Sequence, residues 1–353
     1  MISRPMIPPR TMTTNTSPTT TIATRLGELG ATPRHVQLVL GAWLAGKPLE
    51  SALESRHVTF APRVAAVLPA LAAELDALLR LASEHAGADG SARLLHALAD
   101  GQTIESVLLV REGVCVSTQV GCAVGCTFCM TGRGGLVRNL TLDEILAQVA
   151  AARRRRDNVR RVVFMGMGEP SHNLANVLAA IDVLGDAGRF GHKELVFSTV
   201  GDRRLFERLA ARRTKPALAL SLHTTRDELR AELLPRAPRI GVSELVSLAD
   251  AYSKTSGHPI QLQWTLLAGV NDGDAELDAL TELLRGKRFI VNFIPFNPVE
   301  GAGFDRPSAE RAEVLARTLT ERGVLSKVRQ SAGQDVEGAC GQLRARAATA
   351  PAS

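Results

Sequence analysis

Short apolar runs alternate with stretches of helical periodicity through the second half of the chain. The sequence Thr141-Leu-Asp-Glu144 has the pattern of a capping box, which predicts a helix running to about Arg156. Apolar runs that predict strands lie at 161–165, 195–197, 217–220, 260–267 and 289–294, and helical patterns lie at 173–187, 203–213, 241–254, 273–285 and 307–322. Repeated strand–helix units of this spacing predict a parallel sheet, and about six of them predict a complete or partial barrel.

The pattern before the cysteine-containing region is different. Helical periodicity dominates residues 24–90, with apolar positions three and four apart from Val64 to Leu81. Residues 91–116 alternate in the manner of strands on both sides of the turn Asp100-Gly101. We therefore expect a small helical accessory domain at 24–90 and a larger domain at 91–345.

The ends of the chain have another composition. Residues 1–23 are rich in Thr and Pro, lack acidic side chains and contain too few apolar residues to pack. An organelle transit peptide is an alternative because such peptides are poor in acids, but Pro8, Pro9 and Pro18 oppose the amphipathic helix that it needs. We expect disordered tails at 1–23 and 346–353.

The overall composition is that of a globular protein, with 45% apolar and 22% charged residues, which excludes disordered and fibrous classes. No apolar run approaches the length of a membrane span, so we expect no membrane association. The net charge of +6 and pI near 9.4 favour a polyanionic partner such as a nucleic acid. With five cysteines and no pattern of a secretory signal, we expect a reducing compartment, the cytoplasm.

Three of the cysteines lie in one short stretch, Gly121-Cys-Ala-Val-Gly-Cys-Thr-Phe-Cys129. Thiolates are the ligands of iron–sulfur clusters, and Cys122, Cys126 and Cys129 would leave one iron of a four-iron cluster without a protein ligand. A zinc knuckle is the alternative, but closed zinc sites need four Cys or His ligands and no His lies within twenty residues of the stretch. The spacing therefore predicts an iron–sulfur cluster with an open iron.

Polar or glycine-containing sequences follow most of the predicted strands. In parallel barrels, active groups gather on loops at the carboxyl ends of the strands. The segments at these ends are 122–129, 166–170, 198–201, 221–223 and 295–297. Each alone is a weak signal, since a glycine-rich turn is commonly only a turn and His223 alone is commonly a packed histidine. Together they predict one shared mouth.

The cysteine stretch, Gly168-Glu169 and the barrel-like alternation resemble radical S-adenosylmethionine (SAM) enzymes. More narrowly, the sequences at 113–122, 164–170, 294–298 and 339–343 resemble the RlmN/Cfr family of RNA adenosine methyltransferases, and the likeness runs from about residue 91 to 343. The resemblance implies a partial TIM-like (β/α)6 radical SAM barrel with a small N-terminal helical accessory domain. It also implies a [4Fe-4S] cluster and SAM as cofactors.

The resemblance assigns roles to particular residues. Cys122, Cys126 and Cys129 would hold the cluster, and the residues at the positions where the family holds SAM are Gly168, Glu169, Ser198, Ser221, Leu222, His223 and Asn297. Cys340 would carry the methyl group, whose radical form adds to a ring carbon of adenine. Cys115 would release the product by a transient disulfide with Cys340, and Glu105 would remove the ring proton.

The residues themselves also permit other interpretations. Cys340 could be a small buried apolar residue, and an alternating strand could explain Cys115 and a solvent-facing Glu105 without any chemistry. The chain departs from the family at Ser198-Thr-Val-Gly-Asp-Arg-Arg204 and at 329–338, so the choice between carbon 2 and carbon 8 of adenine stays open.

The partners follow from charge and from the resemblance. RNA is expected, 23S rRNA first and tRNA second, with flavodoxin or ferredoxin as electron donor and a monomeric protein. Two basic clusters could hold phosphates: Arg153–Arg156 with Arg160 and Arg161, and Arg203, Arg204, Arg208, Arg212 and Arg213. Solvated faces beside acidic partners are the alternative. The target adenine must be unpaired or extruded to reach a barrel mouth.

Two other function classes remain open at this point. A different radical SAM enzyme, acting on a small molecule or a protein, would keep the cluster without needing Cys340. An RNA-binding cluster protein without enzymatic activity would leave the set of strand ends unexplained.

Overall fold

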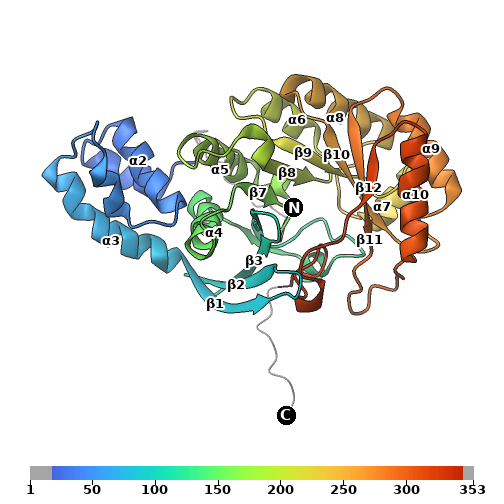
Figure 1. The fold of residues 1–353 in the computed structure, drawn as a ribbon, viewed down its shortest axis with the longest axis horizontal. Helices are drawn as coiled ribbons and strands as arrows, with labels where there is room; N and C mark the ends of the chain where they lie inside the picture. The colour runs from blue at the N-terminus through green and yellow to red at the C-terminus, as the bar shows by residue number, and fades with distance from the viewer. Residues whose placement is uncertain (1–17, 345–353) are drawn as a thin grey trace, which may run out of the picture.

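A computed structural model of the chain describes residues 18–344 (Figure 1). Most of the predicted tail at 1–23, and all of that at 346–353, lies outside the described residues. The prediction of a disordered tail is wrong for its last residues, because helix α1 already begins at Thr21 and extends to Glu28. Its start is anchored, since the Thr20 side chain accepts a hydrogen bond from the Ala23 amide and Thr21 donates to Asp143 through its amide (2.8 Å) and its hydroxyl (2.5 Å).

The predicted N-terminal helices are present and lie at one end of the molecule, beside α4 and α5 (Figure 1). After α1 come α2 (Pro33–Leu44), the 3₁₀ helix η1 (Leu49–Glu54) and α3 (Pro62–Leu78). Both α2 and α3 begin with proline, whose fixed φ suits the first helical position. The helical pattern expected to reach Leu81 ends at Leu78, where the chain passes directly into a strand.

That strand, β1 (Leu79–Ala86), belongs to the main sheet. The predicted boundary of the helical domain at residue 90 is therefore wrong. Strand β1 pairs antiparallel with β2 (Ala92–Leu98), which pairs antiparallel with β3 (Thr103–Leu109). The turn predicted at Asp100-Gly101 connects β2 and β3. Long-range pairing with β2 therefore decides the conformation of 79–86, not the local helical pattern.

From β4 onward the sheet is parallel, as predicted. Its strand order is β1-β2-β3-β4-β7-β8-β9-β10-β11-β12. The parallel strands are β4 (Gly113–Cys115), β7 (Arg161–Phe164), β8 (Leu195–Thr199), β9 (Ala217–Ser221), β10 (Ile260–Leu266), β11 (Phe289–Pro295) and the short β12 (Ser326–Val328). Within residues 18–344 the sheet does not close, because β1 and β12 are its two edges, so the α/β architecture is the predicted partial barrel.

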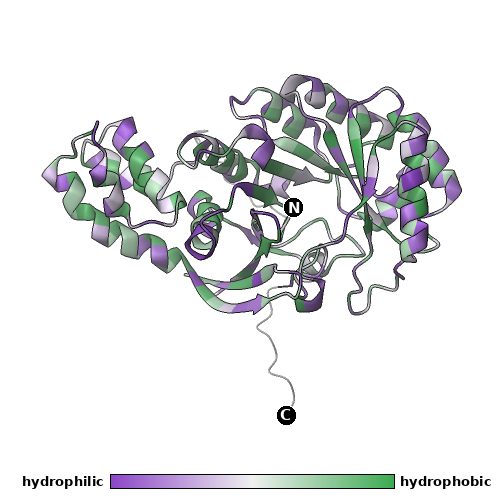
Figure 2. Cartoon of the chain, in the orientation of Figure 1, coloured by the Kyte–Doolittle hydropathy of each residue, from purple (hydrophilic) through white to green (hydrophobic). Residues whose placement is uncertain are grey.

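Helices cover the outer side of the parallel strands (Figure 1). They are α4 (Leu142–Arg155), α5 (Leu174–Asp186), α6 (Arg203–Ala210), α7 (Asp227–Leu233), α8 (Val242–Ser256), α9 (Asp274–Leu284) and α10 (Ala309–Glu321). Figure 2 shows their polar stripes facing outward and apolar strands between them. Within residues 18–344, no helix is long and apolar enough to cross a membrane.

Candidate active site

The predicted strand-end segments meet in one cavity of about 160 Å³. Its wall includes residues from the loops after β4, β7, β8, β9 and β11, together with the C-terminal segment. From the predicted set these are Cys122, Cys126, Cys129, Gly168, Glu169, Ser198, Ser221, His223, Asn297 and Cys340. Their convergence agrees with the general placement of active groups at the carboxyl ends of parallel strands.

The three clustered cysteines lie on the connection of a small antiparallel hairpin, β5 (Gln119–Gly121) and β6 (Leu136–Asn139). The base of this cysteine loop is closed by a hydrogen bond from the Cys122 amide to the Gly135 carbonyl, at 2.9 Å. Gly121 has a φ of +77°, and a Cβ there would lie 2.0 Å from the Gly135 oxygen, so only glycine fits. Tight closure at the base orders the loop between residues 122 and 135.

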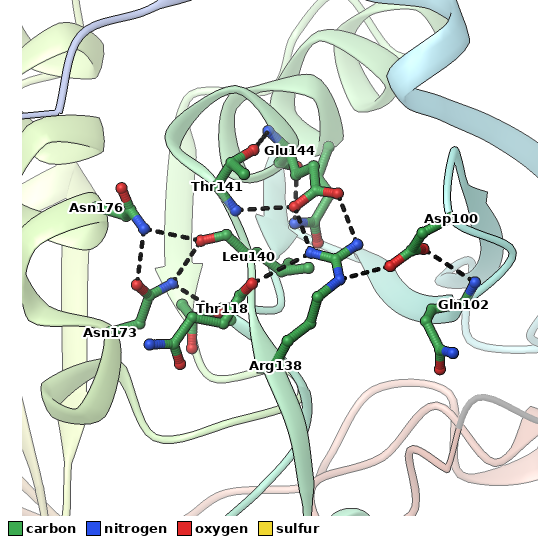
Figure 3. A network of polar contacts seen from close by, with 11 residues as sticks. Asp100, Gln102, Thr118, Arg138, Leu140, Thr141, Glu144, Asn173 and Asn176 are labelled. Carbon is green, nitrogen blue, oxygen red and sulfur yellow. Dashed lines mark hydrogen bonds and ion pairs between the residues drawn. The ribbon is translucent and has the colours of Figure 1, made fainter. Parts of the chain in front are cut away.

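A polar network holds this hairpin against the rest of the fold (Figure 3). The Arg138 guanidinium on β6 binds both carboxylate oxygens of Glu144, at 2.8 Å each, and Asp100 in the β2–β3 turn, at 2.6 Å. Glu144 also closes the predicted capping box of α4 by accepting from the Thr141 amide. A single cation therefore ties the cysteine hairpin, the start of α4 and the antiparallel part of the sheet together.

Burial raises the pKa of all three thiols in the cysteine loop. For Cys122 the pKa rises to about 11, mainly because burial disfavours the thiolate, and the negative charges of Glu169 and Cys129 add to the rise. Burial and the charges of the other thiols also raise the pKa of Cys126 and Cys129. The three thiols are thus close enough to influence one another, and a bound cation would favour their charged form.

Glu169 is held at the cavity wall by donors from the next strand end. One carboxylate oxygen accepts from the Thr199 hydroxyl at 2.7 Å and the other from the Val200 amide at 3.0 Å. The preceding Gly168 has a φ of +100° and packs so closely on Gln119 that a Cβ would lie 2.6 Å from the Gln119 Cβ. The glycine therefore allows the turn that aims Glu169 at the cavity.

His223 enters the cavity from the end of β9 in a left-handed conformation, with φ +68°. Its Nδ1 accepts the Thr265 amide at 3.0 Å, so Nε2 carries the proton of the neutral ring. Burial, followed by the charge of Arg230, lowers the pKa of His223 to about 3. His223 is therefore a neutral hydrogen-bond donor at neutral pH.

Leu222 differs from its neighbours. Its side chain is fully buried in the main core and does not line the cavity, while Ser221 and His223 on either side do. Its amide donates to the Gln263 carbonyl at 3.2 Å. The side chain of Leu222 therefore does not line this cavity, which leaves its backbone for the SAM-binding position that the resemblance implies.

Cys340 lies on a C-terminal segment that is bound directly to the cysteine loop. The Met130 amide donates to the Gly341 carbonyl and the Thr131 hydroxyl to the Leu343 carbonyl, each at 2.7 Å. Asn297 at the end of β11 donates to the Cys340 carbonyl at 3.0 Å. Cys340 is exposed at the cavity, so the alternative of a buried apolar residue is wrong.

Cys115 lies on β4, is buried and does not line the cavity. Burial, and next the negative charge of Cys340, raise the pKa of Cys115 to about 12. The charge of Cys340 therefore acts on Cys115, although the two residues are far apart in sequence. All five cysteines of the chain are free thiols in the structure, so the expected transient disulfide is not formed here.

Glu105 on β3 is fully buried, so the alternative of a solvent-facing position is wrong. One carboxylate oxygen accepts from Arg93 Nη1 at 2.5 Å and the other from the Arg344 amide at 2.9 Å. It does not line the cavity. Glu105 therefore connects β2, β3 and the segment that carries Cys340.

The two predicted basic clusters are largely engaged within the fold. In the first, Arg154 pairs with Asp76, Arg155 pairs with Glu84, and Arg156 binds the carbonyls of Leu109 and Gly90. In the second, Arg203 pairs with Glu244, Arg212 with Asp182 and Arg213 with Asp186. For most of these side chains the structure therefore favours the alternative to phosphate binding, in which they lie on solvated faces beside acidic partners.

Several cavity-related residues escaped the sequence reasoning. Gln263 and Thr265 line the cavity from β10, and Arg230 on α7 donates to the carbonyls of two lining residues. Gln263 and Thr265 could have been found from the sequence, because polar residues occupy alternate positions of the apolar run 260–267. Arg230 carried no such signal, because its pattern is that of an ordinary charged helix residue.

The donor set fits a cluster and SAM. Three thiols without other ligands face one cavity, as a four-iron cluster with an open iron requires. Among residues 18–344, no three His, Cys, Asp or Glu side chains are grouped tightly enough for a single metal ion. A four-iron cluster is larger than one ion and spreads its thiolates further apart. The carboxylate, hydroxyl and amide groups beyond the thiols suit the amino acid and nucleoside parts of SAM.

Comparisons with known proteins agree with this site. Residues 116–280 match the Radical SAM superfamily. Probable RNA methyltransferases of Aromatoleum aromaticum and Bordetella avium are each 62% identical over 325 residues, which cover 92% of this chain and 91% and 92% of theirs. The crystal structure of a radical SAM methyltransferase from Sphaerobacter thermophilus is similar with a TM-score of 0.78 and 37% identity, covering 92% of this chain and 97% of that one.

Proposed function

Because this chain belongs to the RlmN/Cfr-like family of RNA methyltransferases within the radical SAM superfamily, we propose that it methylates a ring carbon, C2 or C8, of an adenosine in RNA. We propose 23S rRNA as the first substrate to examine and tRNA as the second. The observation that carries the proposal is the exposure of Cys340 in the same cavity as the three clustered cysteines.

We assign the binding of the cofactors to the residues of this cavity. Cys122, Cys126 and Cys129 hold the [4Fe-4S] cluster. The residues that hold SAM are Gly168, Glu169, Ser198, Ser221, His223 and Asn297, with Leu222 restricted to its backbone. When bound, these groups supply a methyl group and a radical that abstracts a hydrogen atom. Glu169 accepts hydrogen bonds from an amine, and neutral His223 donates one from Nε2.

The chain's own part in the transfer begins at Cys340. Its exposed Sγ takes up the methyl group as a thioether, and the activated carbon then bonds to the adenine ring. Asn297 holds the Cys340 carbonyl, and the cysteine loop holds the carbonyls of Gly341 and Leu343. These contacts keep the carrier sulfur at the cavity.

Release of the product requires Cys115 and Glu105. Glu105 takes the proton from the ring carbon. The Cys115 thiolate then attacks Cys340 Sγ, forming a disulfide and breaking the carbon–sulfur bond. The electron pair leaves with the carbon, which takes up a proton as the methyl product. Radical addition leaves one unpaired electron on the ring, which passes to a one-electron carrier, and a reductant restores the two thiols. Because Glu105 is buried beside Arg93, its approach to the ring needs movement of the Arg344 segment.

Mass spectrometry of nucleosides from ribosomal and transfer RNA tests this function. Cells lacking the gene should lose one methyladenosine, and the wild-type protein should restore it while Cys340→Ala should not. Cys115→Ala should stall with RNA attached to Cys340, detected as a protein–RNA adduct. No change in any methyladenosine on deletion would contradict the RNA assignment, and full activity of Cys340→Ala would contradict the carrier mechanism.

We also propose the partners that this chemistry needs. A one-electron carrier such as flavodoxin or ferredoxin supplies electrons, and the protein works as a monomer in the cytoplasm, where thiols stay reduced. Reduction of the purified protein by either carrier tests the first point. Size-exclusion chromatography with light scattering tests the second, and a dimer would contradict it.

A further inference from the structure

Arg230 on α7 lies directly behind the wall of the active-site cavity. It is only 5% exposed, and its Nη2 donates to the Val200 carbonyl at 2.5 Å and to the Ser221 carbonyl at 3.4 Å. Both carbonyls belong to residues that line the cavity from the ends of β8 and β9. A guanidinium is thus fixed across two strand ends, on the side away from the bulk solvent.

This buried cation has no carboxylate at ion-pair distance within the described part of the chain. Its Nε is also buried without a hydrogen-bond partner there. Burial lowers the pKa of Arg230 to about 10, so the side chain is still protonated at neutral pH. Burying a charge without a counterion is costly, which indicates that an anion outside the polypeptide completes the site.

The neighbouring acidic groups indicate on which side of Arg230 an anion would bind. The helix that carries Arg230 contacts the cysteine loop directly, because the Thr127 amide, next to Cys126, donates to the Leu233 carbonyl of α7 at 3.0 Å. The charges that act on Arg230 are those of Cys126, Asp227 and Glu169. Asp227 accepts from the Val242 amide at 2.7 Å, and Glu169 is held by Thr199 and Val200. The thiolate side, at Cys126, is where a further negative charge would arrive with a cluster.

We propose that Arg230 is a positioning residue whose charge stabilises the reduced cluster and raises its reduction potential. The inference rests on the proposed function, since it requires the three cysteines to hold a [4Fe-4S] cluster. Reduction adds one negative charge, and net charge near an iron–sulfur cluster is one of the factors that set its potential. A buried guanidinium is screened little by salt, so its effect reaches the cluster through protein rather than water.

The test uses the full chain with its cluster reconstituted under anaerobic conditions. Arg230→Gln removes the charge and keeps an amide donor, Arg230→Lys keeps the charge, and Arg239→Gln removes an exposed cation nearby as the matched control. Electron paramagnetic resonance during titration with dithionite measures the reduced fraction, and iron analysis and SAM affinity are measured on the same samples. We expect at least a tenfold fall in the reduced-to-oxidised ratio at fixed potential for Arg230→Gln, about 59 mV for one electron.

The outcomes separate the proposal from a purely structural role. Arg230→Lys should stay nearer the wild type than Arg230→Gln, and Arg239→Gln should not shift the potential. An unchanged potential in Arg230→Gln with full iron content, or equal losses of potential in the Gln and Lys variants, would overturn the proposal. If Arg230→Gln does not retain iron, Arg230→Lys decides: a loaded cluster near the wild-type potential supports the proposal, and its loss overturns it. Failure of the wild type to bind a cluster counts instead against the proposed function.

Discussion

Replacing Arg93 alone should lower the free energy of unfolding more than replacing both Arg93 and Glu105. The pair is buried, with side-chain exposures of 7% and 0%, and its atoms lie 2.5 Å apart. Loss of one partner of such a pair costs about 3–5 kcal/mol because a charge stays buried without its counterion, whereas apolar replacement of both is often neutral. We therefore expect Arg93→Met to be destabilised by about 3 kcal/mol or more, and Arg93→Met/Glu105→Leu by much less.

Equilibrium unfolding in urea measures these differences. The protein should be metal-free and kept reduced, since a bound cluster would add its own stabilisation. Circular dichroism and the fluorescence of the buried Trp43 and Trp264 report on different regions, and coincident transitions justify a two-state analysis. The exposed pair of Arg154 and Asp76 gives the control, and Arg154→Met should cost about 1 kcal/mol or less.

The double-mutant cycle can refute this reasoning. If the Arg93 and Glu105 replacements simply add, the two charges do not stabilise each other in the fold. If Arg93→Met is no less stable than Arg154→Met, burial of the Glu105 charge carries no measurable cost, and the structural account of this pair is wrong.

Three further predictions follow from local geometry. Gly168→Ala should weaken SAM binding at least tenfold with little loss of secondary structure, because the new Cβ would clash with Gln119 and turn Glu169 away from the cavity. Isothermal titration calorimetry measures the affinity for SAM, and a wild-type affinity would contradict this prediction. In the metal-free protein at pH 8, iodoacetamide should alkylate the exposed Cys340 first while the buried Cys115 resists, which peptide mass spectrometry can follow. The pKa of Cys115 is raised to about 12, so burial of its neutral thiol stabilises the fold below pH 9, and this contribution is lost as the pH rises from 9 to 12. Urea midpoints measured across this pH range can follow that loss. Glu276→Gln should make residues 223–226 after β9 more mobile, because the Glu276 carboxylate accepts hydrogen bonds from backbone and side-chain groups of that segment. Faster amide hydrogen exchange at 223–226 would show this, and unchanged exchange would contradict it.

The parallel part of the fold could be predicted because its signals are local. Each strand from β7 to β11 is a short apolar run followed by a helical pattern, and the rule on strand ends then groups Glu169, His223 and Asn297 without knowledge of their distances. The predicted meeting of these groups in one cavity is confirmed by the structure. The roles assigned to them stay predictions.

What escaped prediction depends on contacts between distant residues. Strand β1 has a composition that also suits a helix, and its pairing with β2 decides the outcome. Burial of Glu105 depends on Arg93 and on Arg344, which lies 239 positions away. Arg230 has the sequence pattern of a solvated helix residue, and only the packing of α7 on the strand ends shows that it is enclosed.

The direct hydrogen bonds between the cysteine loop and the C-terminal segment have a consequence for how this enzyme class can diversify. Met130 and Thr131 fix Gly341 and Leu343, and Asn297 at the end of β11 fixes Cys340, so the spacing of the sulfur atoms depends on contacts at the carboxyl ends of the strands. The turn between α9 and β11 leads into the opposite end of its strand, so insertions there can change length without altering that spacing. Evolution, and a protein engineer, can therefore vary that turn while the arrangement of thiols is inherited intact.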